Sequence, residues 1–231
     1  RRWKIMKVKT VLQRLPFSKR TWWKHYAATL RYGLYVILHP FDGFWDLKHE
    51  KRGSMAAANT FVLLALLTQV WSRMYSNWLF VDVDLQRFNV WLECGTFLVP
   101  LVIFCIANWC LTTLFDGKGT LRDIYILTAY ALVPFILLRL PMTFVSNVLL
   151  KDEQMLFTFF NSLGLLWSAA LLICGQMMVH DYSLSKTLLF TVATVVGMAV
   201  IITLCLMIFS MVSEAVGYFA SLYRELRFQF Y

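Results

Sequence analysis

The chain has 231 residues, of which 59% are hydrophobic and 15% are charged. Soluble domains are about 45–50% apolar and about 25% charged, because their surfaces need polar side chains. The composition therefore excludes a soluble globular enzyme, a disordered tail and a disulfide-stabilised secreted module, and it indicates an integral membrane protein. Residues 1–53 hold 13 Lys/Arg and three Asp/Glu, whereas the rest of the chain holds nine and ten, so the formal net charge of +9 comes from the N-terminal segment.

This basic segment contains the pattern of an amphipathic helix over residues 18–38. Ser18 can cap its start, and His39-Pro40 ends it. Aromatic and basic side chains together are typical of a helix that lies in the headgroup layer. The candidate lipid-surface residues are Arg20, Trp22, Trp23, Lys24 and Arg31. We expect this segment to bind anionic lipids of the inner leaflet; the alternative is a core helix of a small cytoplasmic domain.

The same segment predicts neither a nucleic-acid partner nor a signal peptide. No recognisable nucleic-acid-binding fold accompanies the basic charge, and the basic stretch is much longer than the n-region of a signal peptide. The sequence starts at Arg1 without a methionine, so we expect further residues before it.

Five apolar stretches are long enough to cross a bilayer, which takes about 20 helical residues. They lie at residues 55–74, 90–114, 124–149, 157–180 and 187–219. With the N-terminus inside, the inner face holds 16 Lys/Arg, the 13 of residues 1–53 and three later ones, whereas the outer face holds five. Because inner loops are rich in Lys/Arg, we expect a multi-pass plasma-membrane protein with a cytoplasmic N-terminus and an extracellular C-terminus.

The predicted fold is all-α, a polytopic bundle of five transmembrane helices preceded by the interfacial helix. Residues 1–53 form the basic cytoplasmic segment, 54–222 the membrane domain and 223–231 an extracellular tail. The last helix is too long for one crossing, since residues 187–222 make about 54 Å of helix against roughly 30 Å of hydrocarbon. Its end, which includes Glu214, is expected to project beyond the outer face, either as a docking surface or as a frayed end.

The chain offers few groups for catalysis. The sequence contains no zinc-protease, nucleophile-elbow, P-loop or dinucleotide-binding motif. The adjacent His/carboxylate pair His180-Asp181 is interpreted as the end of a helix at the membrane surface, because neighbouring side chains on a helix point apart. We expect no catalytic residue, no bound cofactor and no metal.

Glu93 and Arg139 are the two charges predicted to lie inside the membrane. Such charges are costly unless paired, so they are the first candidates for a functional site. Arg139 lies about 15 Å below the outer end of its span, and its side chain can extend towards Glu93 near the outer surface. The pair is either a substrate or partner site or a structural contact within the bundle.

Two further features predict packing inside the bundle. The pairs Gly164/Ser168 and Ala193/Gly197 have the spacing that lets helices approach closely. The five cysteines, Cys94, Cys105, Cys110, Cys174 and Cys205, lie in apolar stretches without metal-binding spacing, and we expect them to be small buried hydrophobic residues.

Three segments carry a more specific signal. They are LRYGLYVILHPFDGFWDLKHEKRGS (30–54), NWCLTTLFDGKGTLRDIYILTAYALVPFIL (108–137) and HDYSLSKT (180–187). With the Asp116-Gly117 loop and the run from Tyr130 to Pro134, they resemble the bacterial branch of the Yip family over residues 25–225. This resemblance implies a five-span bundle with the N-terminus inside and the C-terminus outside.

The resemblance also implies a function. Bacterial relatives tend to be encoded beside carbohydrate ABC importers, so the leading hypothesis is a non-catalytic accessory subunit that binds ABC permeases and an extracellular binding protein. Eukaryotic relatives are trafficking proteins that meet Rab-type GTPases, which makes a trafficking factor the second hypothesis. A small channel or transporter that uses Glu93 and Arg139 is the third.

Overall fold

The computed structural model of the chain describes residues 19–77, 80, 88–115 and 117–229, without the side chains of 19–25 and 226–229. The regular elements of this described part are helices, so the predicted all-α class is confirmed. The elements are α2 (Lys19–Leu38), α3 (Pro40–His49), α4 (Met55–Tyr75), α5 (Val90–Leu114), α6 (Leu121–Ala131), α7 (Val133–Val145), the 3₁₀ turn η1 (Lys151–Glu153), α8 (Gln154–His180) and α9 (Leu184–Gln229).

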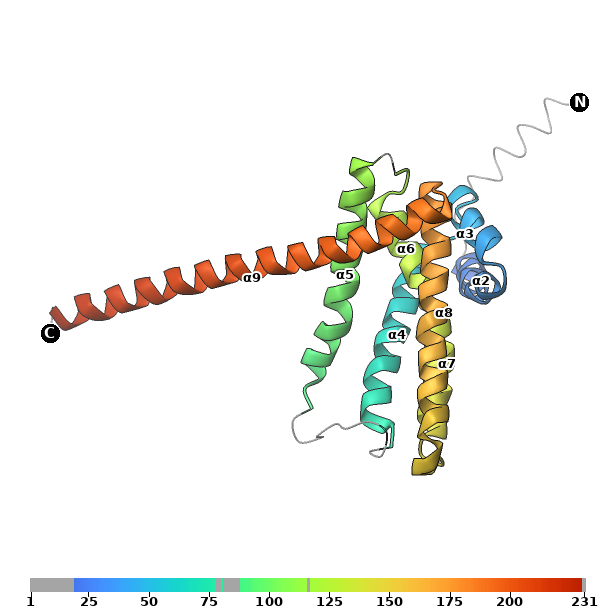
Figure 1. Cartoon of the computed structure of the whole chain (residues 1–231), viewed down its shortest axis with the longest axis horizontal. Coiled ribbons are helices and arrows are strands. Elements are labelled where there is room, and N and C mark those ends of the chain that lie inside the picture. Colours follow the sequence, from blue (N-terminus) through green and yellow to red (C-terminus); the bar gives the residue numbers. More distant parts are fainter. Residues whose placement is uncertain (1–18, 78–79, 81–87, 116, 230–231) are drawn as a thin grey trace, which may run out of the picture.

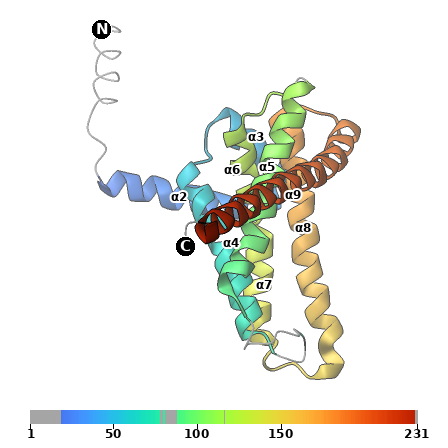
Figure 2. The ribbon, with the colours of Figure 1, turned by 90° about the vertical axis from the view of Figure 1, so that its left-hand side faces the viewer.

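Five stretches of helix in the described chain are long and apolar enough to cross a membrane, which confirms the five predicted spans. The third span is the pair α6 and α7, and it ends at Val145, four residues before the predicted end. In Figures 1 and 2, α4, α5, α7 and α8 run side by side. At one end of the bundle, α3, the α5–α6 loop and the α8–α9 loop lie together. We call this end the α3 end of the bundle.

The third span is interrupted at Leu132, two residues before Pro134. Proline lacks a backbone N–H, so Pro134 cannot donate the helical hydrogen bond to the residue four positions earlier. The backbone N–H of Phe135 donates instead to Ser168 Oγ on α8, over 3.1 Å. A neighbouring helix thus satisfies the backbone group that the interruption frees.

The small-residue pairs pack within the chain, as predicted. A Cβ on Gly164 would lie 3.2 Å from Leu138 Cβ, so this glycine lets α8 approach α7 closely. Gly197 packs in the same way against Leu111 of α5. The expectation for the cysteines is wrong in part: Cys105 is buried, but Cys110 on α5 and Cys205 on α9 are exposed.

The N-terminal region packs on the bundle more closely than an interfacial helix requires. Helix α2 ends at Leu38 and α3 begins at Pro40, which confirms the predicted boundary; Ser18, its predicted cap, lies outside the described residues. Helix α2 crosses the bundle helices near the α3 end (Figures 1 and 2). Gly33 allows this contact, because a Cβ there would lie 2.7 Å from Phe61 Cζ on α4.

Helix α3 was not predicted from the sequence. Proline at its first position is favourable, because the first N–H of a helix has no intrahelical partner. Its Phe44 is fully buried and lies against Gly175 of α8. Part of the segment predicted to be cytoplasmic therefore belongs to the packed core.

Helix α9 leaves the bundle. It starts beside α8 at the α3 end, crosses α5 and continues far beyond the other helices, steeply inclined to them (Figure 1). Its first turns are anchored: Thr187 and Thr194 are buried, and the Thr191 hydroxyl donates to Gln176 Oε1 on α8 over 2.7 Å. Residues 202–225 are all exposed, so only the beginning of this helix packs on the rest of the chain.

Candidate functional site

The Glu93 carboxylate is held by α4 at the end of the bundle opposite the α3 end. Gln69 Nε2 donates to Glu93 Oε1 over 2.7 Å, and Arg73 Nε lies 3.3 Å from the same oxygen. The Glu93 side chain is only 14% exposed, so these contacts replace most of its solvation. Gln69 and Arg73 are one turn apart on α4 and therefore present their side chains on one face.

This arrangement corrects the predicted pair of Glu93 with Arg139, because the ion-pair partner of Glu93 in the described chain is Arg73. Arg139 Nε donates to Ser72 Oγ over 3.2 Å, and its guanidinium lies 5.1 Å from the centre of the Phe135 ring. Arg73 is one of the five Lys/Arg that the predicted topology places at the outer face. The i, i+4 spacing of Gln69 and Arg73 predicts that they share one face of α4, but the sequence does not show that this face lies towards α5.

Further hydrogen bonds join α4 and α7 at this end. The Asn147 amide donates to the carbonyl of Tyr75 over 3.1 Å, and the backbone N–H of Asn77 donates to Ser146 Oγ over 3.3 Å. These contacts favour the structural interpretation of the two membrane-depth charges. The cluster links α4, α5 and α7 through side-chain hydrogen bonds. Its two arginines and one carboxylate give it a formal net charge of +1.

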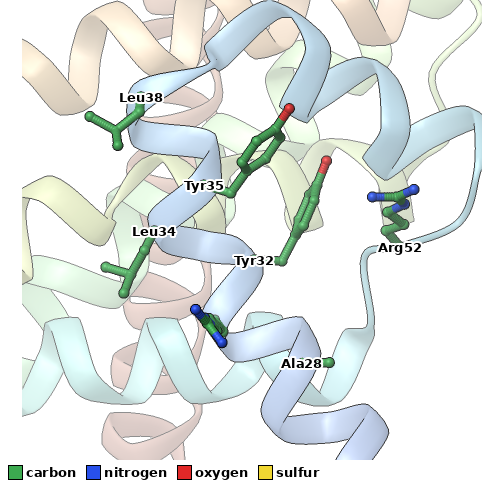
Figure 3. Close-up of a pocket in the computed structure, with 7 residues that line it drawn as sticks. Ala28, Tyr32, Leu34, Tyr35, Leu38 and Arg52 are labelled. Carbon is green, nitrogen blue, oxygen red and sulfur yellow. The ribbon is translucent and has the colours of Figure 1, made fainter.

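Of the five candidate lipid-surface residues, the structure describes the side chain of Arg31 only. The side chains of Arg20, Trp22, Trp23 and Lys24 lie outside the described residues, whereas Arg31 is exposed. Arg31 lines a groove of about 560 Å³ along α2 (Figure 3). The other lining residues are Ala28, Tyr32, Leu34, Tyr35, Leu38 and Arg52. Leu34 and Leu38 are 51% and 74% exposed, as expected for a face that contacts lipid.

The second base of this groove, Arg52, is neutralised by carboxylates. It lies 2.6 Å from Glu50 and 3.5 Å from Asp46, and its guanidinium lies over the Tyr32 ring. The Tyr32 hydroxyl donates to Asp46 Oδ2 over 3.1 Å. Burial and this hydrogen bond raise the pKa of Tyr32 above its ordinary value. The groove therefore combines an apolar lining with little net charge.

At the α3 end, the two loops singled out by sequence bind each other. The N–H of Gly119 donates to His180 Nδ1 over 3.4 Å, and the Tyr182 hydroxyl donates to the carbonyl of Phe115 over 2.9 Å. Lys118 Nζ lies 3.1 Å from Asp181 Oδ2. As predicted, His180 ends helix α8, and Asp181 follows with a left-handed φ of 55°. The His180 ring is nevertheless buried, at 2% exposure.

Lys48 connects α3 to the same loops. Its Nζ donates to the carbonyl of Val179 over 2.6 Å and lies 3.9 Å from Asp181 Oδ2. Partial burial alone would raise the pKa of the Asp181 carboxyl, but the hydrogen bond from Lys118 and the charges of Lys48 and Lys118 outweigh it, so the pKa is lowered. Salt bridges and hydrogen bonds thus fix α3, α8 and both loops relative to one another.

The described residues include no group of three or more His, Cys, Asp and Glu that could hold a metal ion. A family model of the Yip1 domain matches residues 34–218 of the chain. No curated protein and no solved structure gives a significant match. The match begins within α2, continues through the four spans of the bundle and includes most of α9. The chain therefore belongs to the Yip1 domain family of multi-pass membrane proteins.

Proposed function

We propose that this protein is a non-catalytic accessory subunit that binds the spans of other membrane proteins, and that its partners belong to an ABC-type carbohydrate importer of the plasma membrane. The proposal takes the N-terminus as cytoplasmic and the C-terminus as extracellular. The exposure of α9 supports it most directly. Only 6% of the apolar stretch of α9 is buried inside the structure, compared with 56% of the apolar stretch of the span Leu121–Val145.

A long apolar helix that leaves its own bundle offers a large surface to another membrane protein. Residues of small volume on this surface, such as Ala199, allow a partner helix to approach closely. The importer itself is suggested by the resemblance to the bacterial branch of the family. In such a complex the α3 end would lie near the permease–ATPase contacts, and the exposed length of α9 would lie along the spans of a permease.

Purification from native membranes in a mild detergent, followed by mass spectrometry of the co-purifying proteins, tests this function. We expect two permease subunits and an ATPase in fixed ratio. Ala199→Trp, which adds bulk to the exposed face of α9, should release them. Ala170→Trp on an exposed position of α8 is the matched control and should retain them. A lone protein or a homo-oligomer in the wild-type preparation would contradict the proposal.

The resemblance to eukaryotic relatives suggests a second candidate, a membrane-trafficking factor of the Rab-interacting type. The same purification separates the two candidates, because a trafficking factor should retain small GTPases rather than permeases. Neighbouring genes offer an independent test, since importer genes beside this one support the first candidate only.

A further inference from the structure

A second hollow, of about 500 Å³, lies at the α3 end between α3, the loop that follows it and the beginning of α6. We call it the basic pocket. Its polar lining includes Lys48 of α3, Lys51 of the loop, and Thr120 and Arg122 at the beginning of α6, and its apolar lining includes Leu47 and Ile126. Figure 2 shows α3 and α6 side by side at this end of the bundle.

The backbone of residues 50–54 places the loop directly on α6. Lys51 has a left-handed φ of 52°, which turns the chain after α3. Gly53 lies so close to α6 that a Cβ there would be 2.9 Å from both Ile126 Cγ2 and Leu47 Cδ2. This close contact brings Lys51 to the pocket. Its neighbour Arg52 lines the groove of Figure 3 instead.

The lining of the basic pocket has excess positive charge. Asp123 is the one acid among its described lining residues. The Asp123 carboxylate accepts hydrogen bonds from the N–H and hydroxyl of Thr120, over 3.0 Å and 2.7 Å, so the cap of α6 already uses it. Lys51 and Arg122 are exposed and make no ion pair within the described chain, unlike Arg52 in the groove.

The geometry points to a binding site for a phosphate group in the basic pocket, with Lys51 and Arg122 as its main cationic contacts. Guanidinium and ammonium groups form strong, charge-assisted hydrogen bonds with phosphate oxygens. The pocket lies beside Leu121, where the third span begins, and it includes apolar residues. A phosphate carried by an anionic lipid headgroup fits this position at the membrane edge; free phosphate shares the same chemistry. The site does not depend on the partners proposed above.

The test measures thermal unfolding of the purified full-length protein in an uncharged detergent, by tryptophan fluorescence. Three probes are titrated separately: dioctanoyl phosphatidylglycerol, dioctanoyl phosphatidylcholine and inorganic phosphate. We expect phosphatidylglycerol to raise the unfolding temperature, because a ligand that binds the native state stabilises it. Phosphatidylcholine, which has no net charge, should have a much smaller effect. If inorganic phosphate alone reproduces the shift at similar concentration, the ligand is free phosphate rather than a lipid.

Variants locate the site. In Lys51→Gln/Arg122→Gln the apparent affinity for phosphatidylglycerol should fall roughly tenfold or more, since each base near an anionic surface contributes appreciably. The control Lys151→Gln/Lys186→Gln removes the same charge at two exposed positions outside both the pocket and the groove, and it should bind normally. Lys51→Arg keeps the charge and should also bind normally. Equal responses to the two lipids, or equal losses in the double variant and its control, would overturn the inference.

Discussion

The Tyr130 hydroxyl donates a hydrogen bond over 3.2 Å to the carbonyl oxygen of Thr29, a residue 101 positions earlier in the chain. Tyr130 is fully buried, and its ring meets Phe61 of α4 edge-on at 5.0 Å between centroids. One side chain of α6 thus contacts both α2 and α4. The bond explains why α2 is fixed to the bundle rather than resting on it through lipid contacts alone.

Replacing Tyr130 by phenylalanine should lower the free energy of unfolding by about 1 kcal/mol, because a buried hydrogen bond between α6 and α2 is lost. Thermal unfolding in detergent micelles measures the change. Tyr125→Phe is the control: its hydroxyl donates to Asn59 at an exposed site, where water can replace the lost bond. Equal losses in the two variants would contradict a special role for the Tyr130–Thr29 bond.

The pairing of Glu93 with Arg73 predicts non-additive effects on stability. In a double-mutant cycle, Glu93→Gln and Arg73→Gln should couple by about 1 kcal/mol, because each removes the same interaction. Glu93→Gln and Arg139→Gln should show the smaller coupling. The opposite order would restore the pair predicted from the sequence.

Gly119 has no room for a side chain. A Cβ there would lie 2.6 Å from His180 Cε1 and 2.7 Å from Val179 Cγ1. Gly119→Ala should therefore cost about 1–3 kcal/mol of stability, as overpacking does in other cores. Gly217→Ala is the matched control, since nothing lies within 4 Å of a Cβ at that position of α9. That substitution should be neutral or stabilising, because alanine favours helix more than glycine does.

The ion pairs of Asp181 predict a dependence of stability on pH. The pKa of Asp181 is lower in the folded protein than in the unfolded chain, where the pKa of an aspartate is about 3.9. The stabilisation is therefore present above that unfolded value and is lost as the pH falls through the folded pKa. Unfolding temperatures measured between about pH 6 and 3 should fall less steeply for Asp181→Asn than for the wild type. A parallel decrease in both would show that Asp181 contributes little.

The spans could be predicted because hydrocarbon thickness fixes the length of the apolar runs, and Pro40 marked the boundary between α2 and α3. Helix α3 could not, since its ten residues include charged side chains, and its place depends on the contact of Phe44 with Gly175. The partner of Glu93 was missed because Arg73 lies in the last turn of α4, where sequence alone does not distinguish an outward from an inward side chain.

The sequence also predicts that the last helix is too long for one crossing, but it does not predict the direction of this helix. That direction depends on the contact of Gly197 with Leu111 and on the turn at Asp181, neither of which has a strong local signature. The basic pocket depends similarly on Gly53, because Lys51 and Arg122 are 71 positions apart and meet only where the loop lies on α6.

Helix α9 packs on the rest of the chain only over its first turns, so a small rotation there moves its far end by a large distance. Its packed part ends near Gly197, and the 32 residues from there to Gln229 extend for about 48 Å at 1.5 Å each. A rotation of only about 10° at the anchor therefore moves the far end by about 8 Å, given that helical rise. The hydrogen bond between Thr191 and Gln176, together with the Asp181 turn, thus sets the position of a surface tens of ångströms away, so small local changes there are geometrically amplified.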